Sequence, residues 1–284
     1  MTPSYSPEEL DKIITAALAE DIGSGDVSAA AALPDGKTGK AKLLIKEDGI
    51  IAGIDVARKI FQRIDPSLTL EVFKNDGDEI RTGEIAFIVS GKASAILAAE
   101  RVVLNCMQRM SGIATYARKL CDMIRGTRGR LMDTRKTTPN FRLLEKWAVA
   151  IGGGLNHRMG LYDMIMIKDN HADLAGGIGN AISNVKRYLK ESGKKLRVEV
   201  ETRNLNEVKD VLQAGGVDVI MLDNMSIEDM RAAVALIGNK CKTEASGGIT
   251  ESNLKAVAET GVDYISMGAL THSVKSLDLS LKVQ

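Results

Sequence analysis

Short apolar runs alternate with amphipathic segments through the second half of the chain, and this pattern predicts a parallel α/β sheet. Between the runs, apolar residues recur three or four positions apart, as on one face of a helix. The six runs expected to form strands are residues 130–136, 164–170, 196–202, 217–224, 242–249 and 262–270. Successive strand–helix units place their strands parallel, in a sheet that is either open or closed.

Every one of the six runs ends in polar residues or glycines, and this favours a closed sheet. The endings read DTRK, KDN, EVET, LDN, SGG and MGA. In an α/β barrel, functional residues gather at the carboxyl ends of all strands, whereas an open sheet uses mainly the point where strand order reverses. Six units fall short of the usual eight. Either the earlier part of the chain contributes a strand, or the barrel is incomplete.

The first third of the chain has a different pattern, which predicts a separate mixed α/β region. Short β-like runs at residues 41–45, 68–73 and 85–89 are separated by glycines. A helical stretch from about residue 93 to residue 109 follows, with apolar side chains on most faces. Such a helix is expected to be buried, at a domain junction or a subunit interface.

Composition excludes several classes of partner. The 284 residues include 38 Lys and Arg against 37 Asp and Glu, so no overall field attracts nucleic acid or an anionic membrane. Three scattered cysteines cannot build a disulfide framework and suit a reducing compartment. No stretch reaches the roughly 18 apolar residues of a membrane span, and no signal peptide is evident. A cytoplasmic protein is therefore expected.

The densest group of candidate functional residues lies between Asp133 and Pro139, where a strand should meet a helix. Arg135 and Lys136 are followed by the hydroxyls of Thr137 and Thr138. Two cations, two hydroxyls and free backbone N–H groups can clamp a carboxylate or a phosphate. The alternative is a solvated polar turn.

Two further candidate cationic groups follow. Three glycines at 152–154 precede His157 and Arg158, which predicts a loop that presents both side chains to an anion; a structural helix stop is the alternative. Lys168 ends an apolar run, where burial is costly unless the lysine meets an anion or forms a covalent intermediate. The alternative is a strand-end lysine whose amine stays in water.

Carboxylates end the next two runs. Glu199 and Glu201 point to the same side of their strand because side chains alternate with a period of two, and Asp223 ends the following strand. These groups could hold Mg²⁺ together with waters and substrate oxygens. Otherwise they should pair with the lysines and arginines described above.

Glycine turns end the last two runs and indicate phosphate binding. Ser246, Gly247 and Gly248 form one turn, and Gly268 lies in the other. Late barrel strands commonly bind phosphate through such turns. His272 lies just beyond and could contact the same phosphate, although a single histidine near a helix start is more often structural. Local positive charge in a chain of net charge +1 indicates a ligand with several negative charges.

The motifs AERVVLNCMQRMSGIAT, DTRKTTP, GGGLNHRMGLYD, IKDNH, LDN and EASGGI resemble, in order, those of the quinolinate phosphoribosyltransferase family. The resemblance extends through nearly the whole chain. It implies an N-terminal α/β sandwich and a C-terminal α/β barrel with fewer than eight complete units. The implied domains are residues 1–110, joined by the C-terminal segment 273–284, and residues 111–272.

The family resemblance also implies an activity. Members transfer phosphoribosyl from 5-phosphoribosyl-1-pyrophosphate to quinolinate with Mg²⁺, and form nicotinate mononucleotide, pyrophosphate and CO₂ for NAD biosynthesis. Arg101 would enter the site of a partner subunit in a homodimer or hexamer. The implied substrate-binding residues are Arg101, Arg135, Lys136, Thr137, His157, Arg158, Lys168, Glu201, Asp223, Ser246, Gly247, Gly248, Gly268 and His272, with Lys136, Lys168, Glu201 and Asp223 catalytic and with Glu201 and Asp223 at the metal.

Three other functions are compatible with these residues. Lys168 could form a Schiff base in an aldolase, because strand-end lysines of barrels serve that chemistry. A related barrel could transfer phosphoribosyl to a different carboxylated base. A barrel that binds a phosphorylated ligand without turnover is the third alternative.

Overall fold

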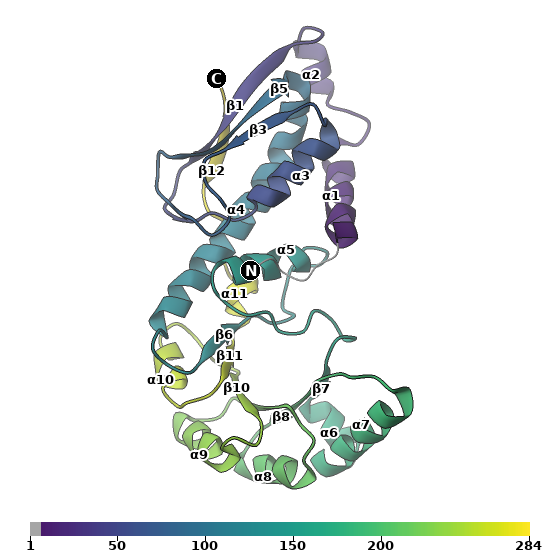
Figure 1. Cartoon of the computed structure of the whole chain (residues 1–284), viewed down its shortest axis with the longest axis vertical. Coiled ribbons are helices and arrows are strands. Elements are labelled where there is room, and N and C mark those ends of the chain that lie inside the picture. The colour runs from purple at the N-terminus through teal and green to yellow at the C-terminus, as the bar shows by residue number, and fades with distance from the viewer. Residues whose placement is uncertain (1–6) are drawn as a thin grey trace. The chain divides into compact units, whose positions relative to one another are not determined.

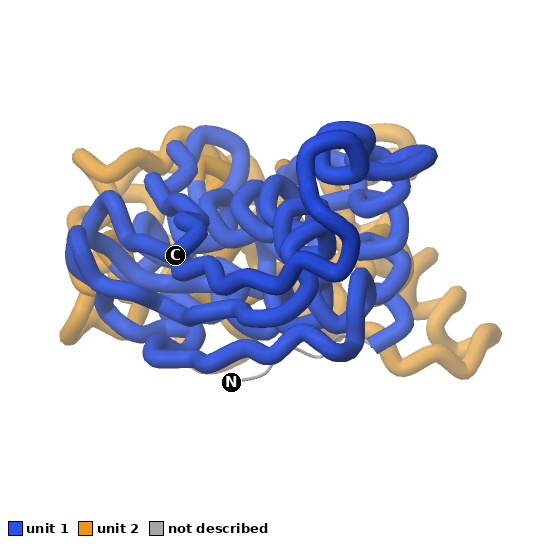
Figure 2. Tube along the Cα trace, turned by 90° about the horizontal axis from the view of Figure 1, so that it is seen from above, with its two compact units in different colours: residues 1–118, 137–153, 270–284 blue, residues 119–136, 154–269 orange. Residues whose placement is uncertain are grey.

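The computed structural model describes residues 7–284 and divides into two compact units. The first contains residues up to 118, residues 137–153 and residues 270–284; the second contains residues 119–136 and 154–269 (Figure 2). Compact units and domains need not divide at the same residues. The domain boundaries expected from the sequence therefore stay a prediction.

The first unit is built on an antiparallel sheet with the strand order β12-β1-β5-β3. These strands are β1 (Thr38–Ile45), β3 (Thr69–Val72), β5 (Ile85–Lys92) and β12 (Leu279–Val283). In β1 the buried residues alternate along the strand, which is the pattern of a sheet with one covered face. Phe61 of α3 (Ile54–Ile64) packs edge-to-face against Phe87 of β5. The mixed α/β region predicted for the first third is confirmed.

The long apolar helix α4 (Ala93–Met123) begins in the first unit and ends in the second. Its 31 residues include the stretch predicted to be helical, and most of its apolar side chains are buried. No helix among the described residues, α4 included, is long and apolar enough to cross a membrane. The other elements of this unit are α1 (Pro7–Ile22), α2 (Val27–Ala32), β2 (Gly49–Ile50), β4 (Glu79–Ile80), α5 (Arg142–Ile151) and most of α11 (Ala269–His272).

The second unit contains the parallel sheet predicted from the six apolar runs. Its strands are β6 (Arg130–Met132), β7 (Ile165–Ile167), β8 (Val198–Thr202), β9 (Val219–Asp223), β10 (Lys242–Ser246) and β11 (Tyr264–Ser266). Helices α6 to α10 lie along the outer side of the curved sheet (Figure 1). These are α6 (Asp169–Leu174), α7 (Ile178–Ser192), α8 (Leu205–Ala214), α9 (Ile227–Ile237) and α10 (Leu254–Ala258). All five residues of β8 are buried, as expected for a strand covered on both faces.

This sheet is an incomplete barrel. The strand order is β6-β11-β10-β9-β8-β7, so β6 and β7 are its two ends. Beyond β6, a single parallel bridge joins Met132 to Leu155. Strands β1 to β5 belong to other sheets, so among the described residues no earlier strand completes the barrel. Of the two explanations for the missing strands, incompleteness is the correct one.

Candidate active site

Lys168 and Glu201 form an ion pair at the carboxyl ends of β7 and β8. The Nζ atom of Lys168 donates to Oε2 of Glu201 at 2.7 Å. The lysine side chain is 45% exposed, whereas that of Glu201 is 8% exposed. Lys168 is therefore not the desolvated, unpaired amine that a Schiff-base enzyme uses as its nucleophile. It is a strand-end cation that balances one carboxylate and keeps its other donors accessible.

Asp223 and the glycine turn lie beside this ion pair on the next strands. Asp223 ends β9 directly opposite Ser246, which ends β10. Gly247 and Gly248 follow with φ values of 81° and 60°, a conformation that favours glycine. We call Lys168, Glu201, Asp223 and the turn 246–248 the rim site. Its two carboxylates, its lysine and its glycine turn suit a ribose that carries phosphates.

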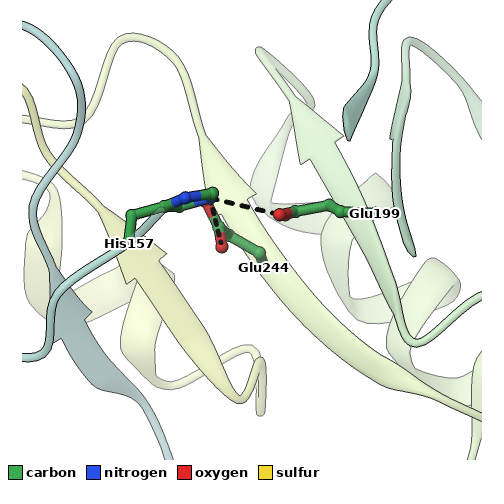
Figure 3. A group of neighbouring side chains, drawn as sticks. All are labelled: His157, Glu199 and Glu244. Atoms are coloured by element: carbon green, nitrogen blue, oxygen red, sulfur yellow. Dashed lines mark ion pairs between the residues drawn. The ribbon is translucent and has the colours of Figure 1, made fainter. Parts of the chain in front are cut away.

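A second polar cluster lies deeper, inside the barrel. His157, Glu199 and Glu244 come from three different segments, and their side chains point toward one another (Figure 3). Nε2 of His157 lies 3.1 Å from Oε2 of Glu199 and 3.6 Å from Oε2 of Glu244. Each of the three side chains is at most 7% exposed. We call these three residues the interior cluster.

Hydrogen bonds determine the tautomer of His157. The backbone N–H of Arg158 donates to Nδ1 at 2.7 Å, so this nitrogen must carry a lone pair. In the neutral ring the proton then lies on Nε2, where Glu199 can accept it. The backbone N–H of His157 donates to Oδ1 of buried Asp133 at 2.9 Å, which fixes the segment itself.

Burial makes the interior carboxyls weak acids. Desolvation raises the pKa of Glu199 to about 7. Desolvation, followed by the charge of Glu199, raises the pKa of Glu244 to about 8. Two close carboxyls of this kind titrate as a pair and share a proton near neutral pH. Burial, together with the nearby charge of Arg135, lowers the pKa of Arg158 beside them.

The interior cluster is the one group of three possible metal ligands among the described residues. A metal ion on Nε2 would need the proton on Nδ1, which already accepts the N–H of Arg158. This hydrogen bond argues against a metal there. At the rim site, Glu201 is neutralised by Lys168, and Asp223 accepts from Asn224 through Oδ2. Asp223 therefore fits a hard cation better than Glu201 does, with substrate and water oxygens as the other ligands.

A cavity of about 250 Å³ adjoins the interior cluster. His157, Arg158, Glu199 and Glu244 line it, together with Arg197 and Tyr264. Arg197 precedes β8 and Tyr264 begins β11, so the cavity extends toward the amino ends of the strands.

The predicted binding residues are divided between the two units. The second unit, which contains the rim site, also contains Arg135, Lys136 and Gly268. The backbone N–H of Lys136 donates to Oγ1 of Thr134. Arg101, Thr137 and His272 belong to the first unit. The roles expected for all of the predicted binding residues stay predictions.

The glycine run has a structural function at its first position. Helix α5 ends at Ile151, and Gly152 packs against α4, where an added Cβ would lie 2.6 Å from that of Ala117. The helix stop, which was the alternative interpretation, is therefore the function of Gly152. Glu244 was not singled out from the sequence, although it is a charged residue between the buried Thr243 and Ala245. Its position inside the run 242–249, which was expected to form a strand of the parallel sheet, was the available signal.

Two plant proteins and one solved bacterial structure are similar to this chain over almost its entire length. A chloroplastic nicotinate-nucleotide pyrophosphorylase (carboxylating) of Arabidopsis thaliana is 48% identical over 99% of this chain and 84% of its own. A mitochondrial quinolinate phosphoribosyltransferase (decarboxylating) of Nicotiana glauca is 47% identical over the same shares. The solved nicotinate-nucleotide pyrophosphorylase of Francisella tularensis superposes with a TM-score of 0.92, at 38% identity, over 99% of this chain and 98% of its own.

The expectation of a cytoplasmic protein is contradicted by the two plant relatives, whose names place one in chloroplasts and the other in mitochondria. The expectation rested on a few scattered cysteines and on the absence of apolar spans. The few cysteines indicate a reducing environment, and such an environment is not peculiar to the cytoplasm.

Family models account for both parts of the chain. The N-terminal domain of quinolinate phosphoribosyl transferase matches residues 26–111, and its C-terminal domain matches residues 113–282. Together with the relatives above, these matches cover the rim site, the interior cluster and all three sheets of the described residues. The chain belongs to the quinolinate phosphoribosyltransferase family.

Proposed function

We propose that this chain transfers phosphoribosyl from 5-phosphoribosyl-1-pyrophosphate to quinolinate, with loss of CO₂, and so makes nicotinate mononucleotide for NAD biosynthesis. The observation that carries the proposal is the rim site. Lys168, Glu201, Asp223 and the turn at 246–248 lie at the carboxyl ends of four adjacent strands. This is where barrels place catalytic groups, and the residues match the family motifs in order.

In the proposed reaction the pyridine nitrogen of quinolinate attacks the anomeric carbon of the ribose, and pyrophosphate leaves. The ring becomes cationic. Its positive charge accepts the electron pair released when the C2 carboxylate departs as CO₂, and a proton then adds to C2. Glu201 and Asp223 would orient the ribose hydroxyls. The side chains that would hold the quinolinate carboxylates and neighbouring phosphates are those of Arg135, Lys136, His157, Arg158 and Lys168. The protein thus supplies positioning and electrostatics rather than a nucleophile.

Mg²⁺ is part of the proposal. When bound, it would neutralise charge on the departing pyrophosphate. Asp223 is the side chain best placed to hold it through an oxygen, because the carboxylate of Glu201 is already paired with Lys168. The turn at Gly247 and Gly248 and the proposed contacts of Gly268 and His272 would hold phosphate groups.

The direct test combines purified protein with quinolinate, phosphoribosyl pyrophosphate and Mg²⁺, and measures CO₂ and nicotinate mononucleotide. We expect both products, and little product when nicotinate replaces quinolinate, because the second carboxylate is absent. Folded protein that forms neither product would refute the function. Equal turnover of nicotinate would contradict the roles of Arg135, Lys136 and Lys168. Borohydride trapping of a carbonyl substrate on Lys168 would instead support the aldolase.

We also propose a homodimer or larger assembly in which Arg101 reaches the site of a partner subunit. Arg101 is exposed on α4, a position compatible with a contact outside its own subunit. Arg101→Ala and Lys136→Ala proteins should each be inactive, and should recover about one quarter of wild-type activity when mixed, as expected for statistical exchange in a shared-site dimer. Absence of recovery, with subunit exchange verified by mass spectrometry, would count against a shared site.

A further inference from the structure

We propose that Asn224, the residue directly after β9, is a positioning residue of the rim site. Its side chain holds the Asp223 carboxylate and packs against the turn at Gly247. This inference rests on the proposed function, which assigns Asp223 to ribose and cation and Gly247 to phosphate. Three independent contacts of Asn224 support it.

The first contact is a hydrogen bond to a carboxylate. Nδ2 of Asn224 donates to Oδ2 of Asp223 at 2.7 Å. A half-buried carboxylate at a strand end can otherwise rotate about its χ2 bond. With Oδ2 engaged, Oδ1 is left in a defined direction for a ribose hydroxyl or a cation. Hydrogen bonds of this charge-assisted kind are stronger than those between neutral groups.

The second contact is made by the backbone. The N–H of Asn224 donates to the carbonyl of Ser246 at 2.9 Å, which extends the β9–β10 ladder one step beyond the pair Asp223 and Ser246. The residue has a φ of 53°, and Asn140 is the one other non-glycine residue with positive φ among those described. Glycine adopts this conformation at lower cost. A side chain at position 224 therefore makes this backbone conformation more costly than glycine would, and the hydrogen bond from Asn224 to Asp223 offsets that cost.

The third contact is steric. An added Cβ at Gly247 would lie 2.6 Å from Nδ2 of Asn224, and Gly247 itself has a φ of 81°. The amide of Asn224 therefore packs tightly against the turn expected to receive phosphate. One residue thus contacts Asp223, Ser246 and Gly247, which come from two adjacent strand ends.

The main test is Asn224→Gly in the full-length protein, because this change removes the amide while suiting the left-handed backbone. We expect the melting temperature to stay the same or rise. The KM for phosphoribosyl pyrophosphate should rise by about tenfold, as expected for one charge-assisted hydrogen bond, with the KM for quinolinate nearly unchanged. Asn140→Gly is the matched control, since it makes the same exchange at a φ of 61° in the first unit. It should leave both KM values unchanged.

A second test measures the contact with the turn. Gly247→Ala should lower the melting temperature through both the close contact and the unfavourable φ. Combined with Asn224→Gly, the same change should cost clearly less, because the amide is no longer there to clash. Additive losses in the double variant would refute the packing. If Gly247→Ala does not fold, folding of the double variant would itself demonstrate the coupling, and its failure to fold would count against it.

The outcomes separate this inference from the proposed function. Wild-type protein without transferase activity would refute the function. Active wild-type protein with an Asn224→Gly variant of unchanged KM for phosphoribosyl pyrophosphate would refute the role of Asn224 alone. Equal rises in the KM for both substrates would show a general disturbance of the site and would also refute it.

Discussion

Glu199 and Glu201 lie two residues apart on β8 and face the same side of the strand, yet they have different partners. Glu201 is at the rim and pairs with Lys168. Glu199 is one step deeper and meets the imidazole of His157 and a second carboxyl, Glu244. The position along the strand therefore determines the state of each carboxyl. Glu201, at the rim, is a charge-balanced carboxylate suited to hold substrate, whereas the deeper Glu199 shares a proton with Glu244. Three substitutions test this contrast, described in order of decreasing expected effect.

Lys168→Ala should affect activity far more than stability. Removing one preorganised electrostatic group at a transition state typically costs about 10²–10³ in rate, and this variant also leaves Glu201 without its cation. The melting temperature should fall modestly, because the lysine is 45% exposed but the Glu201 carboxylate that it leaves behind is only 8% exposed. Steady-state kinetics and thermal unfolding measure the two effects. Lys119→Ala, which breaks an exposed ion pair with Glu251 in the same unit, is the control. A similar activity loss in both variants would show that the rim site contributes no more to activity than the control ion pair does.

Glu244→Gln should change how stability depends on pH. The folded protein keeps the Glu244 proton up to a pKa of about 8, whereas the unfolded chain loses it near 4.5. Rising pH therefore favours the unfolded state progressively between about pH 4.5 and pH 8. The glutamine variant lacks this penalty. It should be more stable than wild type by about 1–3 kcal/mol at pH 8 and similar to it near pH 4.5.

Urea unfolding at the two pH values measures the Glu244 effect. Glu201→Gln serves as the rim counterpart, because it loses an ion pair and should change stability by less than about 1 kcal/mol. A Glu244→Gln protein that is less stable than wild type at pH 8 would show that the carboxylate is charged and well paired. The conclusion that Glu199 and Glu244 of the interior cluster share a proton would then be wrong.

Asp76→Asn tests whether a raised pKa marks the site at all. Burial raises the pKa of Asp76 to about 6 in the first unit, where Oδ1 accepts from the backbone N–H of Ile54 at the start of α3. As for Glu244, the folded protein holds the proton more tightly than the unfolded chain does, so stability falls as pH rises from about 4 to about 6. Asparagine keeps the acceptor and removes the penalty, so it should stabilise the protein by about 1 kcal/mol at pH 8. Activity should be unchanged; a large loss would extend the functional region to α3.

Hydrophobic patterning predicted the parallel sheet well, because strands covered on both faces need continuous apolar runs. Each of the six runs contains a strand, although the first strand ends at Met132 and leaves residues 133–136 outside it. The period of two correctly placed Glu199 and Glu201 on one side. It could not give their depth, which depends on how β7 and β9 pair with β8.

Other features of the site depend on contacts that local sequence does not encode. The sequence does not show that Nε2 of His157 faces Glu199 while Nδ1 accepts the Arg158 N–H, and the role expected for His157 at a bound anion stays a prediction. Glu244 becomes part of the interior cluster only once β10 and β8 curve around one interior. The left-handed backbone of Asn224 likewise results from the end of the β9–β10 ladder rather than from its own propensity.

Strand β12 has a consequence for folding. It pairs with β1 through register partners such as Ala41 and Val283, and Asp278 bonds to Glu47 across 231 residues of chain. The N-terminal sheet therefore gains this strand only after the entire parallel sheet has been synthesised on the ribosome. Contacts of such long sequence separation slow folding, and until they form the edge of β1 stays open to other chains. Nascent chains stalled before β12 should thus depend on chaperones more than finished ones.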